Sequence, residues 1–141
     1  MQVLKRDLFS AKKCALAHCV SADLEMGKGI ALEFRKRFGG LEELHAQNPK
    51  IGSVLRLKTP RWEGGPLYYL VTKKLYKHKP TLAALQWTLE RLRERCEEDK
   101  VEELAVPMLG CGLDRLSWDI VKTSIEQAFE GSSVHVIACV L

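Results

Sequence analysis

The chain has 141 residues, of which 46% are hydrophobic and 28% charged, and its formal net charge is +4. This length suits a single domain whose hydrophobic core needs no metal or disulfide to hold it together. No apolar run approaches the roughly eighteen residues of a membrane span, and the first residues lack the apolar segment of a secretory signal. We therefore expect one nuclear or cytoplasmic domain over residues 1–141.

The five cysteines are odd in number and include no C-x-x-C pair. They are therefore predicted to be thiols in a reducing compartment, and a zinc site is not expected. The sequence pI near 8.8 favours an anionic ligand or a polyanion without choosing between them. Aromatic residues make up 7% of the chain and do not interleave with a basic run, so a nucleic-acid surface is not indicated.

The first third of the chain predicts two strands and two helices. A strand over residues 2–5 is followed by a short apolar strand over 15–18. Residues 29–38 then predict a helix, which two glycines end, because apolar side chains recur at helical spacing at Ile30, Phe34 and Phe38. A shorter helix is expected over 41–46.

The middle of the chain predicts a hairpin and a long helix. Strands over 54–58 and 67–72 flank a Gly-Gly-Pro segment, and we expect a turn over 61–66. The longest helix is predicted from Pro80 and Thr81 to Glu98, because one face is apolar and the other charged; its apolar face carries Leu82, Leu85, Leu89, Leu92 and Cys96.

The last third completes the alternation of strands and helices. A buried strand is predicted over 104–108, and Ser117 is predicted to cap a helix that runs through Phe129. Residues 134–140 form a β-branched final strand. This order predicts an α/β fold, a three-layer α/β/α sandwich around a mixed sheet of about six strands.

Ligands of open α/β sheets bind beyond the carboxyl ends of the strands, and the first candidate loop there holds Gly27 and Gly29. A helix start offers free backbone N–H groups and the positive end of the dipole, both of which favour phosphate. Leu32 occupies the third glycine position of a dinucleotide fingerprint, so that motif is absent. On these residues alone, a flexible helix start remains the alternative.

The second candidate loop, Gly110-Cys111-Gly112, follows a buried strand and precedes a helix. Two glycines around one small residue suit a loop whose N–H groups wrap an anion. Asp114 and Arg115 follow directly, and an ordinary surface turn is the alternative for them. Two such loops at one sheet edge would hold a diphosphate from both sides.

Lys73 is a candidate nucleophile at the end of an apolar strand. Burial and the like charge of Lys74 would both favour a free amine. Two solvated lysines leaving the sheet are the alternative, and residue type alone favours it. For His18, a core histidine is the corresponding alternative to a functional role.

The same segments resemble the macrodomain branch of the terminal ADP-ribose protein glycohydrolase, which is also known for O-acetyl-ADP-ribose deacetylation. The matching motifs span nearly the whole chain in the family's order. They are KRDLF at 5–9, LAHC at 16–19, MGKGIA at 26–31, FGG at 38–40, YLVTKK at 69–74, HKPT at 78–81 and GCGLDRL at 110–116.

The resemblance implies a macrodomain that binds ADP-ribose without a metal or other cofactor. Asp7 would accept a hydrogen bond from the adenine amino group, with Leu8 beside it. The two glycine loops would cradle the diphosphate and the distal ribose. The remaining ligand contacts that it implies are His18, Ser21, Met26, Gly27, Lys28, Gly29, Ile30, Pro107, Leu109, Gly110, Cys111, Gly112 and Leu113.

The resemblance also implies a reaction. Lys73 would attack C1 of the distal ribose, and Asp114 would act as acid and base to resolve the lysyl adduct. The expected activity removes mono-ADP-ribose from glutamate and aspartate side chains and deacylates O-acyl-ADP-ribose. The expected partners are ADP-ribose and ADP-ribosylated proteins, with poly(ADP-ribose) as a further candidate and no membrane, and we expect a monomer.

Two other functions stay open at this point. One is a non-catalytic reader of ADP-ribose or poly(ADP-ribose). The other is a basic module that binds poly(ADP-ribose) or nucleic acid through residues 35–37 and 73–79.

Three residues depart from the family's pattern. Arg6 stands where the family has glycine, and Met108 where close relatives would have arginine. Cys139 lies in the final strand, where an aromatic side chain packs against the adenine. By analogy with base stacking, losing that contact would weaken binding by about 1–3 kcal/mol.

Overall fold

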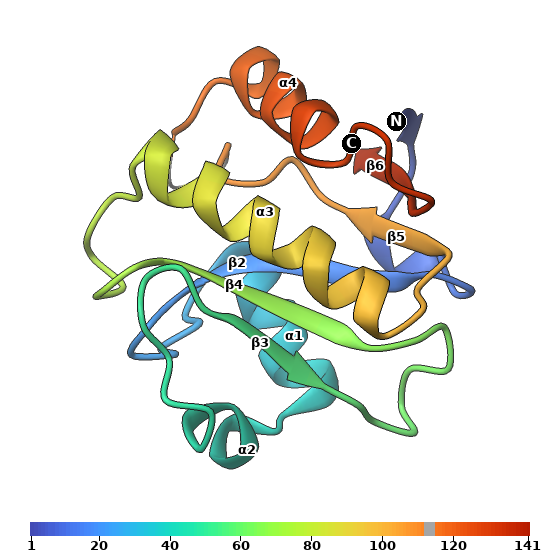
Figure 1. Ribbon diagram of the computed structural model, residues 1–141. Coiled ribbons are helices and arrows are strands. Elements are labelled where there is room, and N and C mark those ends of the chain that lie inside the picture. Colours follow the sequence, from blue (N-terminus) through green and yellow to red (C-terminus); the bar gives the residue numbers. More distant parts are fainter. Residues whose placement is uncertain (112–114) are drawn as a thin grey trace.

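The computed structural model describes residues 1–111 and 115–141, which form one mixed sheet between two helical layers (Figure 1). The strand order is β1-β6-β5-β2-β4-β3, and every neighbouring pair is parallel except β3 and β4. The strands are β1 (Gln2–Lys5), β2 (Ala15–Ser21), β3 (Val54–Leu57), β4 (Leu67–Lys73), β5 (Glu103–Val106) and β6 (His135–Val140). The predicted α/β sandwich with a six-stranded mixed sheet is confirmed.

Helices α1 (Gly29–Phe38) and α2 (Leu41–His45) cover one face of the sheet, and α3 (Leu82–Glu98) and α4 (Trp118–Ala128) cover the other. A short 3-10 turn, η1 (Leu8–Ser10), follows β1. None of the helices in the described ranges is long and apolar enough to cross a membrane.

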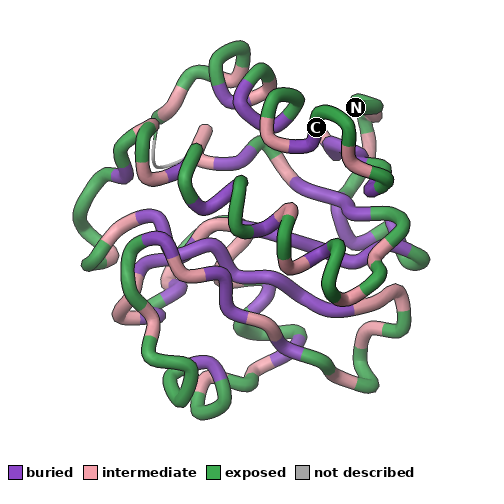
Figure 2. Tube along the Cα trace, viewed as in Figure 1, coloured by how far each residue is buried: buried purple, intermediate pink, exposed green. Residues whose placement is uncertain are grey.

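Strand alternation produces two hydrophobic cores. Tyr69 and Val71 of β4 point to the α1 side and pack with Phe34, while Tyr68 and Leu70 point to the α3 side. Both faces of the central strands are therefore buried, as expected for parallel strands covered by helices (Figure 2). The central strands of the sheet consequently lie out of solvent, and their carboxyl ends are the places where the chain can offer polar groups to a ligand.

The predicted α1 and α3 agree closely with the structure. Thr81 caps α3, with its hydroxyl oxygen accepting a hydrogen bond from the N–H of Ala84 at 3.0 Å. The apolar face of α3 is buried as predicted, except that Leu82 is only partly covered.

Two boundary predictions were wrong. β2 extends to Ser21 instead of ending at His18, because its pairing with β4 continues through Cys19 and Val20. β5 ends at Val106, and Met108 beyond it is 37% exposed. Ser117 is the N-cap residue of α4, as predicted, although its side chain makes no capping hydrogen bond with the described residues.

Candidate functional site

A cavity of about 590 Å³ opens at the carboxyl ends of the parallel strands. The ladder between β2 and β5 joins Ala15 to Leu104 and Leu16 to Ala105; beyond it β2 continues to Ser21 while β5 ends at Val106. The order of the strands also reverses here, because the chain runs from β2 to β4 on one side and from β5 to β6 on the other. Such a switch point leaves a crevice between diverging loops.

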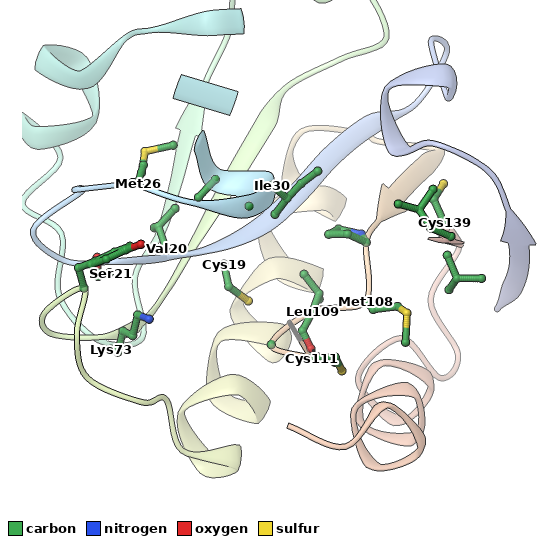
Figure 3. A pocket seen from close by; sticks show the side chains of 17 residues that line it. Cys19, Val20, Ser21, Met26, Ile30, Lys73, Met108, Leu109, Cys111 and Cys139 are labelled. Atoms are coloured by element: carbon green, nitrogen blue, oxygen red, sulfur yellow. Dashed lines mark hydrogen bonds between the residues drawn. The ribbon is translucent and has the colours of Figure 1, made fainter. Parts of the chain in front are cut away.

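Residues from five segments line this cavity (Figure 3). They come from the end of β2, the start of α1, the end of β4, the loop after β5 and the end of β6. They are Cys19, Val20, Ser21, Met26, Gly29, Ile30, Ala31, Lys73, Tyr76, Pro107, Met108, Leu109, Gly110, Cys111, Cys139, Val140 and Leu141.

Both glycine loops reach the cavity, as the sequence predicts. Gly29 begins α1 with φ +60°, and Gly110 has φ +69° in the loop after β5; both line the cavity. The start of α1 therefore faces the cavity, and helix starts carry N–H groups without intrahelical partners. Gly27 and Lys28 lie beside this lining but are not part of it. The predicted contacts Gly112 and Leu113 and the predicted acid/base Asp114 lie outside the described residues.

A β-bulge positions Lys73. Val20 pairs with Val71, but the next residue, Ser21, pairs with Lys73, so Thr72 is the extra residue of β4. A bulge of this kind bends the strand and re-aims the side chain that follows it. Lys73 thereby lines the cavity beside Ser21, which Figure 3 shows at one end of the site. Lys74, by contrast, is exposed and does not line the cavity.

A carboxylate that the sequence did not single out lies close to Lys73. Asp23 accepts hydrogen bonds from the Ser21 hydroxyl at 2.5 Å and from the N–H of Tyr76 at 3.0 Å. Partial burial alone would raise the pKa of Asp23, but these bonds, a third from the N–H of Glu25 and the charge of Lys73 together lower it. Asp23 is therefore an anion next to the candidate nucleophile.

The opposite end of the cavity holds Cys139 and Met108 (Figure 3). The departure at Arg6 lies near this end, because its N–H donates to the carbonyl of Val140 at 2.9 Å. The guanidinium of Arg6 is turned onto Ser10, with Nε 2.9 Å from its hydroxyl. The Arg6 side chain thus lies along η1 and is held there by Ser10. This contact places the long side chain that stands where the family has glycine.

The predicted adenine contacts lie next to this end without lining the cavity. Asp7 is exposed and caps η1, while Leu8 is buried in the core on the α1 side. Burial raises the pKa of the Cys139 thiol; the charge of Arg6 opposes this and that of Asp7 adds to it. Asp7 is therefore near enough to Cys139 for its charge to affect the pKa of the thiol. The contact of Asp7 with the adenine stays a prediction.

His18 lies inside the core on the α1 side instead of in the cavity lining. Its side chain is 0% exposed and stacks on Phe34 with ring centroids 3.6 Å apart. Within the described part of the chain, neither ring nitrogen has a hydrogen-bond partner. The position matches the alternative of a core histidine, and His18 is not among the residues that line the cavity.

This burial predicts a pH-dependent stability. Burial lowers the pKa of His18 to about 3, so the folded protein keeps the ring neutral while the unfolded chain protonates it below about pH 6.5. The free energy of unfolding should therefore fall by about 1.6 kcal/mol between pH 6.5 and 5.0 on account of this residue. Urea titrations at both values should show that His18→Leu removes this difference and that His45→Leu, at an exposed position, keeps it. Equal pH dependence in both variants would contradict the prediction.

Several cavity residues were missed by sequence reasoning. Tyr76 lies beyond the end of β4, and Val140 and Leu141 end the chain. A usable signal was the position of these residues at or just beyond the ends of β4 and β6, which is the edge where ligands bind in such sheets. Among the residues that the structure describes, no cluster of three or more metal-ligating side chains occurs.

Comparisons with known proteins agree with this architecture. No family model matches the chain. It is 46% identical over 134 residues to the ADP-ribose glycohydrolase OARD1 of Homo sapiens, across 94% of this chain and 86% of that protein. It is 29% identical over 136 residues to a DNA ADP-ribosyl glycohydrolase of Thermus aquaticus, across 92% of this chain and 38% of that protein.

Among solved structures, the macrodomain of Mycobacterium tuberculosis DarG superimposes with a TM-score of 0.89 at 27% identity. The match covers 98% of this chain and 95% of that one.

Proposed function

This chain belongs to the macrodomain ADP-ribose glycohydrolases, and we propose that it releases mono-ADP-ribose from glutamate and aspartate side chains. O-Acyl-ADP-ribose is the second proposed substrate, because it carries the same kind of ester. In both reactions the ester joins the distal ribose to a carboxylic acid.

The observation that carries the proposal is the position of Lys73. A β-bulge brings it into the same cavity as Gly29 and Gly110. Backbone N–H groups at such glycine loops suit a diphosphate. A diphosphate held between them would direct one end of ADP-ribose toward Lys73 and the other toward Cys139, because these two side chains lie at opposite ends of the cavity (Figure 3).

The proposed reaction has two steps. The side-chain nitrogen of Lys73 attacks C1 of the distal ribose, and the bond from C1 to the ester oxygen breaks, so that the carboxylate leaves with the electron pair. Asp114 then accepts a proton from the water that attacks C1, and the protonated lysine nitrogen leaves C1 as the neutral amine with the electron pair of the C1–N bond. Water thus enters, and the products are free ADP-ribose and an unmodified carboxylic acid.

The test uses one preparation of the full chain. ADP-ribose binding is followed by calorimetry, and release of ADP-ribose is followed from protein modified on glutamate and, separately, on serine. We expect saturable binding and release from glutamate only, since a carboxylate is a far better leaving group than a serine alkoxide. Binding without release would indicate the reader function. Equal release from serine would contradict the preference for esters. Absence of binding would contradict ADP-ribose as the ligand.

Gly110 offers a second test of the cavity. A residue with a Cβ is strained by about 1–2 kcal/mol at its φ of +69°. The added carbon would also lie 2.8 Å from Cδ1 of Leu116. Gly110→Ala should therefore weaken ADP-ribose binding about tenfold, as measured by calorimetry.

Gly131→Ala is the matched control for this substitution. Gly131 has φ +76° with nothing within 4 Å of an added carbon, and it lies outside the cavity lining. Gly131→Ala should lower the free energy of unfolding by a similar amount and leave the dissociation constant for ADP-ribose unchanged. Equal affinity in the two variants would contradict a role for the Gly110 loop.

A further inference from the structure

Asp23 joins the loop after β2 to the loop after β4. Its Oδ1 accepts from the hydroxyl of Ser21 at 2.5 Å and from the N–H of Glu25 at 3.2 Å. Its Oδ2 accepts from the N–H of Tyr76 at 3.0 Å, across a sequence separation of 53 residues. One carboxylate therefore accepts hydrogen bonds from the segment at the end of β2 and from the segment after β4, near Lys73.

These bonds need a carboxylate instead of an amide. Each oxygen of Asp23 accepts a hydrogen bond from a backbone N–H, Oδ1 from Glu25 and Oδ2 from Tyr76, and an amide would replace one of these acceptors with a donor. In one orientation the amide NH2 would face the N–H of Tyr76, and in the other it would face the N–H of Glu25, so one of the two bonds is lost either way. Hydrogen bonds to a charged acceptor are also stronger than those to a neutral one, so an asparagine side chain at this position could not hold both loops in the same way.

The segment between Lys73 and Tyr76 is consequently held at both ends. At its start, the carbonyl of Lys73 accepts from the N–H of Ala22 at 2.9 Å, and at its end the N–H of Tyr76 is bound by Asp23. The Tyr76 ring lies 5.6 Å from Nζ of Lys73. The hydroxyl end of the ring approaches Gly27, where an added Cβ would be 3.5 Å from the Tyr76 hydroxyl.

We propose that Asp23 is a positioning residue for Lys73: by bridging the two loops it holds the amine and the Tyr76 ring at the cavity. This inference rests on the proposed function, because it assigns Lys73 as the group that must be placed. Asp23 itself takes no part in bond making. Its removal should therefore lower the rate of the chemical step more than the affinity for the ligand.

The test compares Asp23→Asn with Glu25→Gln. Glu25 is an exposed carboxylate on the same loop, and its backbone N–H rather than its side chain joins the network. Both variants lose one negative charge, but only the first loses the bridge. A misplacement of about 1 Å in a catalytic group can cost roughly 100-fold in rate, so we expect kcat of Asp23→Asn to fall between about 10-fold and 100-fold. KM and the ADP-ribose dissociation constant should stay within about threefold of wild type, and Glu25→Gln should match wild type throughout.

Three outcomes would overturn the inference. One is a kcat of Asp23→Asn within twofold of Glu25→Gln, and another is a parallel loss of kcat and ADP-ribose affinity, which indicates general damage to the site. The third is unchanged hydrogen exchange at the Tyr76 amide, which should be faster in Asp23→Asn. If Asp23→Asn does not fold, Asp23→Glu keeps the charge but lengthens the side chain, and the same criteria apply to it.

Failure of the proposed function would be recognised separately. In that case the wild-type protein releases no ADP-ribose at all. The bridge is then judged by hydrogen exchange at Tyr76 and by acylation of the Lys73 amine with acetic anhydride, quantified by mass spectrometry. Faster exchange and faster acylation in Asp23→Asn than in Glu25→Gln support it, and equal rates overturn it.

Discussion

Lys73→Ala should reduce the release of ADP-ribose from glutamate-modified protein by at least about 1000-fold. The substitution removes the nitrogen that the proposed mechanism uses as nucleophile. Without it, water would have to attack C1 directly. The ADP-ribose dissociation constant should change by less than about fivefold, because the glycine loops at Gly29 and Gly110 remain. Release is measured under single-turnover conditions and binding by calorimetry.

Two further substitutions distinguish a role of Lys73 as nucleophile from a role as positive charge. Lys73→Arg keeps the positive charge, but a guanidinium stays protonated and cannot attack, so it should be as inactive as Lys73→Ala. Lys74→Ala removes the neighbouring exposed lysine, which does not line the cavity, and should retain turnover. Substantial activity in Lys73→Arg would show that the site needs a cation there and not an amine.

Phe34→Ala should lower the free energy of unfolding by about 3–5 kcal/mol. Phe34 is 0% exposed and stacks on His18, and its ring centroid is 5.2 Å from that of Phe9. Removing the ring leaves a cavity between α1 and the sheet that these aromatic neighbours cannot fill without moving. Urea unfolding followed by circular dichroism measures the loss.

The same substitution links the core to the site. α1 begins with Gly29 and Ile30 in the cavity lining, so a loosened helix should bind ADP-ribose more weakly than wild type. Phe34→Leu keeps most of the volume and should cost less than about 1.5 kcal/mol. A loss below about 1.5 kcal/mol for Phe34→Ala as well would show that α1 can collapse onto the sheet, contrary to the packing described.

The candidate site combines local and distant information in different proportions. The glycines at 27 and 29 were recognisable because they stand at a helix start, and Gly110 because it belongs to a glycine-rich loop after a strand. The importance of Lys73 depended on the resemblance, since residue type alone favours a solvated lysine. His18 was included through its motif, whereas the packing of Phe34 and Tyr69 around it determines that it lies in the core.

The sequence by itself determined the order of strands and helices, because periodicities of two and about 3.6 residues are written into neighbouring positions. The helix over 29–38 and the long helix ending at Glu98 follow from that alone. Only the tertiary structure decided where β2 ends, which residue of β4 forms the bulge and which carboxylate meets Tyr76. These features depend on pairing between Ser21 and Lys73 and on a bond between residues 23 and 76. Contacts between segments so far apart in the chain leave no periodic trace in either segment.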